Sequence, residues 1–260
     1  MPSTYAHYRM GCRALEHLAP DVASCIRRHR HLYDLGVHGP DFLFFHDPLR
    51  KDSLYQLASQ IHSAPGRDFF APAVRQLRLS PDEGALAYLY GVLAHFALDS
   101  VCHPFINAKA AEGKVGHMEM ETEFDRFLLE LDGIPKPYAH PLTGHISIKN
   151  HADADRIARF YPHLDGKTVE SCIRNYHFLM DFCTARRGLR RSLIGSGVFS
   201  GMANEMMMTP TANLRCEELT PEIYARYQKA EELYPRLMDQ LQADLALGVP
   251  LGEAFDRSFG

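Results

Sequence analysis

Two imidazoles and one carboxylate recur at four-residue spacing within a strongly apolar segment. His95, Asp99 and His103 are each about one helical turn apart, so their side chains share one face of a helix. An unpaired polar group among apolar side chains costs on the order of 2 to 7 kcal/mol, so Asp99 needs a partner. A divalent cation held by these three residues meets that need, and so does a hydrogen-bonded pair of histidine and aspartate. This segment alone leaves both interpretations open.

A second pair of a histidine and a carboxylate follows in the next segment. His117 and Glu121 are again four residues apart, on a helix expected over residues 117–131. Two such pairs in so short a stretch favour a metal site over isolated hydrogen-bonded pairs. Nitrogen and oxygen ligands without a nearby cysteine motif indicate zinc in a catalytic site rather than in a closed structural one.

Three more carboxylates lie on the same expected helix. Glu119 and Glu123 point away from the face of His117 and Glu121, so we expect them to be solvated. Asp125 lies one turn beyond Glu121, where a carboxylate can orient a metal ligand through a hydrogen bond.

The helix that must hold His95 has a clear expected start. Ser80 can act as the cap, Pro81 suits the first helical position, and Glu83 completes a capping box. The residues that follow, 85–98, are apolar on nearly every side. That run is shorter than the roughly 20 residues that a bilayer core requires, so we expect an enclosed core helix that ends at Pro104.

Helical periodicity runs through nearly the whole chain, and no alternating strand pattern bounded by hairpin turns appears. We therefore expect an all-α fold, a single-domain helical bundle. Other helices are expected from just after Thr4 to Pro20 and over 21–33, 52–62, 66–79, 152–160, 168–187 and 221–247. Residues 36–48 combine many helix breakers with many apolar side chains, which predicts a buried irregular segment.

The composition limits the possible classes of protein. With 260 residues and 46% hydrophobic composition, the chain can form one large core, and no polar linker divides it. We expect one domain over 1–260, with the metal ligands within 1–131 and a helical scaffold over 132–260. The formal charge of −4 gives no strong field toward duplex nucleic acid or an anionic membrane. One short basic cluster occurs, at Arg186, Arg187, Arg190 and Arg191.

The start of the chain lacks the basic and apolar regions of a secretion signal, and no segment reads as a membrane span. The cysteines contain no C-x-x-C pair, which is typical of reduced and mostly buried thiols, with Cys102 expected in the core. We therefore expect a cytoplasmic protein. The cysteines are Cys12, Cys25, Cys102, Cys172, Cys183 and Cys216.

Taken together, these motifs resemble the zinc-dependent phospholipase C family, which is related to the single-strand-specific zinc nucleases. The resemblance spans about residues 1–131. Its motifs are Ala6-His7-Tyr8, Gly39-Pro40-Asp41, Ile61-His62 before a Phe-Phe pair, His95-x-x-x-Asp99-x-x-x-His103-Pro104, and His117-x-x-x-Glu121.

The resemblance implies a cluster of two or three zinc ions at the end of a helical bundle, with Asp99 as a bridge. One zinc would be held by Asp41, His62, His95 and Asp99, a second by His103, His117 and Glu121, and a third by His7 with Asp99. In the family, an N-terminal tryptophan completes the third site, and this chain has no tryptophan. The alternatives for the third site are Pro2 in place of the tryptophan, water in its place, or a site without zinc. His46, which is closer to Asp41 in the sequence, is the rival of His62.

The resemblance also implies the chemistry. Clustered zinc ions lower the pKa of bound water from ~15.7 to about 7, which provides a hydroxide for attack on a phosphodiester. Asp41 would be both a ligand and the base that orients this water. A phosphoester substrate, a phospholipid among the candidates, is expected. A single-strand nuclease, a phosphomonoesterase and a metal-binding protein without turnover remain alternatives. Phe42, Phe44 and Phe45 are either core residues or walls of an apolar substrate groove.

Overall fold

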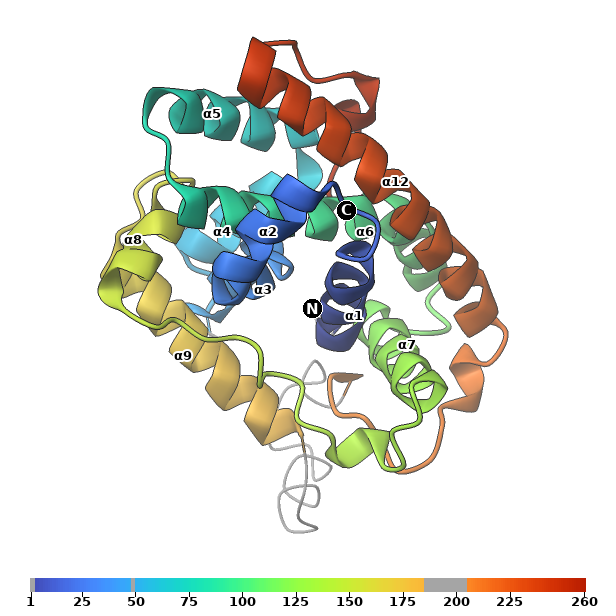
Figure 1. Cartoon of the computed structure of the whole chain (residues 1–260). Helices are drawn as coiled ribbons and strands as arrows, with labels where there is room; N and C mark the ends of the chain where they lie inside the picture. Colours follow the sequence, from blue (N-terminus) through green and yellow to red (C-terminus); the bar gives the residue numbers. More distant parts are fainter. Residues whose placement is uncertain (1–2, 48–49, 185–204) are drawn as a thin grey trace.

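The computed structural model describes residues 3–47, 50–184 and 205–260 of the chain. These described residues form helices and no strand, apart from one isolated bridge between Pro65 and Ser258, which confirms the all-α prediction. The predicted basic cluster at 186–191 lies outside the described residues. The longer helices, of which Figure 1 labels the α-helices, are α1 (Thr4–Ala14), α2 (Pro20–Arg28), α3 (Arg30–Gly36), η1 (Gly39–Phe45), α4 (Ser53–Ser63), α5 (Gly66–Leu79), α6 (Glu83–Ala111), α7 (His117–Leu131), α8 (His151–Ala158), α9 (Gly166–Cys183) and α12 (Leu219–Leu247). Short 3-10 turns follow at Pro137–Ala139, Leu214–Cys216 and Glu253–Asp256.

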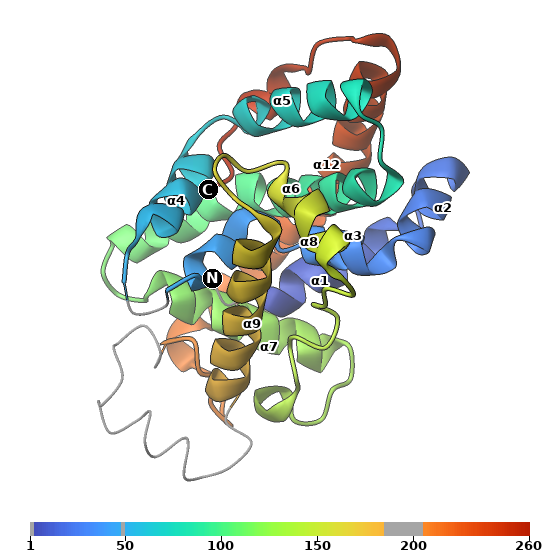
Figure 2. The ribbon, with the colours of Figure 1, turned by 90° about the vertical axis from the view of Figure 1, so that its left-hand side faces the viewer.

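Helix α6 is the central element of the fold. Figure 1 shows it in the middle of the molecule, with α12 along one flank and α8 and α9 toward the other, and Figure 2 again places it among the other helices. By length and composition alone α6 could cross a membrane, but 89% of its most apolar window is buried inside the protein. Its apolar residues on every side therefore serve a core helix, as predicted.

Two glycines allow α3 to lie directly against α6. A Cβ atom added at Gly91 of α6 would lie 2.7 Å from the Cα atom of Gly36 in α3. Larger residues at these positions would separate the backbones. This contact fixes the position of the segment after α3, which carries the next functional residue, Asp41.

Helix α6 differs from the prediction at both ends. Its cap is Asp82, whose Oδ1 accepts a hydrogen bond from the backbone N–H of Ala85 at 2.8 Å, so Ser80 and Pro81 lie before the helix. At the other end Pro104 does not stop the helix, which continues to Ala111. Pro104 lies on an exposed face, and the buried residues around it, Cys102, His103 and Ile106, hold the helix together by packing.

Other boundaries shift by smaller amounts. The single helix expected over 21–33 is two helices, because His29 adopts a non-helical conformation between α2 and α3. Helix α9 starts at Gly166, capped by Asp165, and ends at Cys183. The buried irregular segment is a 3-10 helix, η1.

One hydrophobic cluster extends from Ala6 to Phe259. Helix α12 packs on α6, and the Tyr234 hydroxyl donates to the Tyr90 carbonyl at 3.1 Å, as expected for a scaffold around the central helix. Cys102 is a core residue, as predicted. The extent of the domain, 1–260, stays a prediction.

Candidate metal centre

Five elements bring the eight predicted ligands into one region. Helix α6 carries three of them, α7 carries two, and α1, η1 and α4 carry one each. Seven of these side chains are buried, and the His117 side chain is 27% exposed. The eight residues are His7, Asp41, His62, His95, Asp99, His103, His117 and Glu121.

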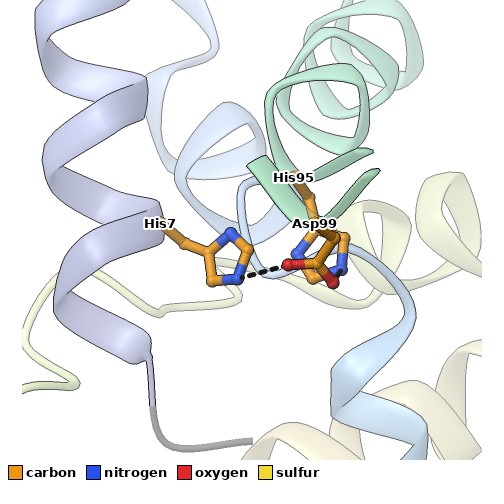
Figure 3. Close-up of side chains that lie close together, drawn as sticks. All are labelled: His7, His95 and Asp99. Atoms are coloured by element: carbon orange, nitrogen blue, oxygen red, sulfur yellow. Dashed lines mark ion pairs between the residues drawn. The ribbon is translucent and has the colours of Figure 1, made fainter. Parts of the chain in front are cut away.

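Asp99 lies at the middle of this region. Its Oδ1 is 3.3 Å from Nε2 of His7, and its Oδ2 is 3.1 Å from Nε2 of His95 and 3.5 Å from Nδ1 of His103. Figure 3 shows His7 reaching from α1 toward the Asp99 carboxylate, which lies beside His95 on α6. Three imidazoles from two helices thus face the two oxygens of one carboxylate.

The second group surrounds Asp41. Its Oδ1 lies 2.9 Å from Nε2 of His62 and 3.7 Å from Nε2 of His95. Nδ1 of His62 is 2.7 Å from the carbonyl oxygen of Ala58, a hydrogen bond that fixes the ring and leaves Nε2 facing the group. The rival, His46, instead pairs with Asp52 at 2.5 Å. The structure therefore brings His62, and not His46, to Asp41.

A close approach of the backbone positions Asp41. Gly39 has a φ of +48°, a conformation that favours glycine, and a Cβ atom there would lie 2.6 Å from Cγ of His95. The Gly39-Pro40-Asp41 motif thus lets η1 lie directly on the histidine of α6.

The third group joins α6 and α7. Nε2 of His103 lies 3.1 Å from Oε1 of Glu121, and Nε2 of His117 lies 3.3 Å from the same oxygen. Nδ1 of His117 is 2.9 Å from Oδ1 of Asn107, which orients that ring. The four-residue spacing predicted this pair on α7, and helix packing places it opposite His103.

The charges in the region suit a cation. Burial alone would raise the pKa of the Asp99 carboxyl, but the surrounding imidazoles, led by His103, hold that pKa well below its usual range. The pKa of Glu121 is also well below its usual range, because the imidazoles of His117 and His103 outweigh the effect of burial. Burial lowers the pKa of His62, but the carboxylates of Asp41 and Asp99 raise it above its ordinary value. The carboxylates of Asp99 and Glu121 are therefore held in the ionised form that binds metal.

Most of the described buried side-chain atoms without a hydrogen-bond partner belong to the predicted ligands. A buried nitrogen or oxygen without a partner is costly, and metal ions bound between these residues would provide partners for those atoms that face one another. They are Nδ1 of His7, Oδ1 of Asp41, Nε2 of His62, both ring nitrogens of His95, Oδ2 of Asp99 and Oε2 of Glu121.

Three sets of ligand atoms are close enough to hold an ion each, with all atoms of a set within 4.8 Å of one another. The donor set therefore fits zinc, a metal that histidine and carboxylate ligands suit. The three sets are His7 with His95 and Asp99, Asp41 with His62 and His95, and His103 with His117 and Glu121.

The carboxylates near Glu121 differ from the predictions. Glu123 is buried, pairs with Arg126 at 2.9 Å and accepts from the backbone N–H of Asn213 at 3.0 Å. Glu119 accepts from the backbone N–H of Gly116 at 3.0 Å and also contacts Asn213. The prediction that both are solvated is wrong, because the segment before α12 packs over this side of α7.

Two features near the centre were not predicted. Nε2 of His38 lies 2.6 Å from Nε2 of His145, and the His38 ring contacts His7 edge to face. The other is the 259–260 segment, in which Phe259 is fully buried and the N–H of Gly260 donates to the carbonyl of His62 at 2.9 Å. A Cβ atom at Gly260 would overlap the His103 ring. No local spacing in the sequence marks either contact.

Comparison with known proteins agrees with this geometry. The family model for zinc-dependent phospholipase C matches residues 6–184, a range that includes all eight predicted ligands. No curated protein and no solved structure matches the chain. The match covers more than half of the sequence, and the zinc dependence of the family agrees with the donor set. The chain therefore belongs to the zinc-dependent phospholipase C family.

Proposed function

We propose that the protein is a zinc-dependent phosphodiester hydrolase of the phospholipase C type. The observation that carries this proposal is the convergence of eight histidine and carboxylate side chains, six of which have a buried nitrogen or oxygen atom without a hydrogen-bond partner among the described residues. A buried cluster of this kind is costly without cations, so its presence supports a metal centre.

When bound, zinc acidifies a coordinated water and neutralises negative charge on a phosphoryl group. The chain's own residues provide the remaining functions. Asp41 is held 2.9 Å from His62 by the backbone of η1, so its carboxylate has a fixed position from which to accept a proton from the attacking water. Asp99 contacts His7 of its own set through Oδ1, and through Oδ2 it contacts His103 of the set that includes Glu121. We propose two or three zinc ions for the three sets.

The three phenylalanines of η1 differ in burial, which determines which of them can contact a substrate. Phe42 and Phe45 are buried, and the Phe45 ring stacks on Tyr176, so these two are core residues. Phe44 is only partly buried, and its ring centroid lies 5.4 Å from that of His62. Of the three, Phe44 is therefore the candidate for contact with an apolar substrate group. The modest charge of −4 favours a lipid over single-stranded DNA.

The test is to incubate the zinc-loaded protein with four substrates and to measure hydrolysis of each. The substrates are p-nitrophenyl phosphocholine, phosphatidylcholine in mixed micelles, single-stranded DNA and p-nitrophenyl phosphate. Hydrolysis of the first two that chelation abolishes supports the proposal. Asp41→Asn should retain zinc better than it retains activity, because Asp41 is asked both to bind metal and to accept a proton. Preference for DNA or for the monoester would assign the same centre to a nuclease or a phosphomonoesterase.

The enclosed centre also fits a second function, metal binding without turnover. Among the predicted ligands that the structure describes, His117 alone is more than slightly exposed. A metal-binding protein without turnover would share this arrangement. Stoichiometric zinc with no hydrolysis of any of the four substrates would favour that function.

A further inference from the structure

Helix α1 carries His7 but lacks its own cap. The cap residue is Ser3, whose side chain makes no cap hydrogen bond among the described residues, and the first turn contains no acidic residue. The first N–H groups of a helix need acceptors, especially in a buried position. Thr4 and Ala6 are nearly fully buried, so water does not provide them.

The missing acceptor comes from α7. Asp125 accepts a hydrogen bond from the N–H of Tyr5 through Oδ2 at 3.0 Å and from the N–H of Ala6 through Oδ1 at 2.8 Å. Both carboxylate oxygens thus serve the first turn of α1. Asp125 is 1% exposed, so these two N–H groups are hydrogen-bonded to a carboxyl group that water does not reach.

This contact links two of the ligand sets. Tyr5 and Ala6 directly precede His7, whose Nε2 lies 3.3 Å from Asp99. Asp125 lies one turn after Glu121 on α7. The carboxylate therefore fixes the first turn of α1 relative to the helix that carries His117 and Glu121.

We propose that Asp125 is a positioning residue that holds His7 against Asp99 and so determines the zinc affinity of the set containing His7. The sequence pattern placed Asp125 beside a metal ligand. The structure shows that it contacts the backbone of α1. This inference rests on the metal centre of the proposed function, and it does not depend on turnover.

The first variant is Asp125→Asn, which keeps the shape of the side chain but replaces one acceptor oxygen by a donor NH2 group. One backbone N–H of α1 then loses its acceptor. Loss of a group that orients a metal ligand weakens metal binding by about 10- to 100-fold. We expect the variant to lose one zinc per chain after dialysis and to keep the others.

Asp132→Asn is the matched control. Asp132 also links this region to α1, through Nε of Arg9 at 2.7 Å and the Tyr5 hydroxyl at 2.8 Å, but near the surface and away from His7. Its loss should leave the zinc content unchanged. A similar loss of zinc in both variants would overturn the proposal, because any weakening of the contact to α1 would then be sufficient.

A rescue variant separates positioning from general destabilisation. Ser3→Asp places a carboxylate at the cap position of α1, from which it can accept the same N–H groups. Added to Asp125→Asn, it should restore the lost zinc and slow the exchange of the Tyr5 and Ala6 amide hydrogens. If Asp125→Asn alone fails to fold and the double variant folds with full zinc content, the capping role is supported. Failure of the double variant to regain zinc would overturn it.

The proposal also requires that Asp125→Asn lowers the zinc content by displacing His7. His7→Ala should lose the same zinc, and adding Asp125→Asn to it should cause no further loss. An additional loss would show that Asp125 acts on another set and would contradict the proposal. If the unmodified protein binds no zinc, the metal centre itself fails. If it binds zinc and Asp125→Asn changes nothing, only the positioning role fails.

Discussion

The His103 ring connects Asp99 with Glu121. Its Nδ1 lies 3.5 Å from Oδ2 of Asp99, and its Nε2 lies 3.1 Å from Oε1 of Glu121. One imidazole on α6 thus joins the carboxylate in the middle of the centre to the carboxylate on α7. Asp99 also contacts His95, which belongs to the other two ligand sets. A substitution of Asp99 should therefore weaken zinc binding in all three sets.

The first prediction compares the amide variants of these two carboxylates. Asp99→Asn removes the charge that faces His7, His95 and His103, so more than one zinc should bind at least about tenfold more weakly. Glu121→Gln should mainly empty the set that it forms with His103 and His117. Elemental analysis of zinc per chain after identical dialysis checks both. Equal losses of a single zinc would contradict the bridging role of Asp99, and unchanged content in both would contradict the metal centre.

Alanine variants of two histidines test the choice of ligand near Asp41. His62→Ala should lose zinc, because Nε2 of His62 lies 2.9 Å from Asp41. His46→Ala should keep full zinc content, because His46 pairs with Asp52 at the edge of the fold. Isothermal titration of the two metal-free variants with zinc measures the difference. Retention by His62→Ala together with loss by His46→Ala would reverse the assignment.

Gly260 provides a steric test of the enclosed centre. A Cβ atom at Gly260 would overlap the His103 ring, so Gly260→Ala should displace that ring and weaken zinc binding by about tenfold. Gly144→Ala is the control, since a Cβ atom there meets no described atom within 4 Å and its backbone is not left-handed. Zinc affinities determined by competition with a chromogenic chelator should differ between the two variants. Identical affinities would show that the 259–260 segment does not constrain His103.

Removal of metal should lower the melting temperature. Zinc that binds only the folded state stabilises it by about 2.7 kcal/mol per site at a hundredfold excess over Kd. Chelation should therefore shift the calorimetric transition downward, and added zinc should restore it, whereas calcium should not. A transition that is insensitive to chelation would mean that the ligand cluster is stable without ions.

The Asp82 cap gives a prediction about pH. Burial raises the pKa of the Asp82 carboxyl, but the N–H of Ala85 and the guanidinium of Arg156 lower it below 3.8 overall. A depressed pKa means that Asp82 stabilises the folded state above about pH 3.8 and that this contribution is lost as the pH falls through the folded-state pKa. Asp82→Ala should reduce the free energy of unfolding by about 1 kcal/mol at neutral pH, and by less in acid.

Urea unfolding of Asp82→Ala at several pH values checks this prediction, and Ser80→Ala is the control. The sequence pattern favoured Ser80 as the cap, but the structure gives that role to Asp82. The control should leave the urea unfolding curve unchanged at every pH. A loss of stability in Ser80→Ala as large as in Asp82→Ala would return the cap to the predicted residue.

The helical class and the shared faces of two helices could be predicted from the sequence pattern alone. Four-residue spacing is a local property of the helix, so His95, Asp99 and His103 had to share one face, and so did His117 and Glu121. The family motifs predicted the remaining ligands, and the assignment of all eight as ligands stays a prediction. The shared helix faces agree with the structure because helical periodicity does not depend on how distant segments pack.

Contacts between residues that are far apart in the chain arise from tertiary packing. Asp125 contacts Tyr5 and Ala6, and Gly260 contacts His62, yet no periodicity links such positions. Packing also carries α6 past Pro104, because the buried neighbours of that turn outweigh the lost backbone hydrogen bond. Local spacing fixes which side chains point together, and long-range packing of the core fixes what they meet.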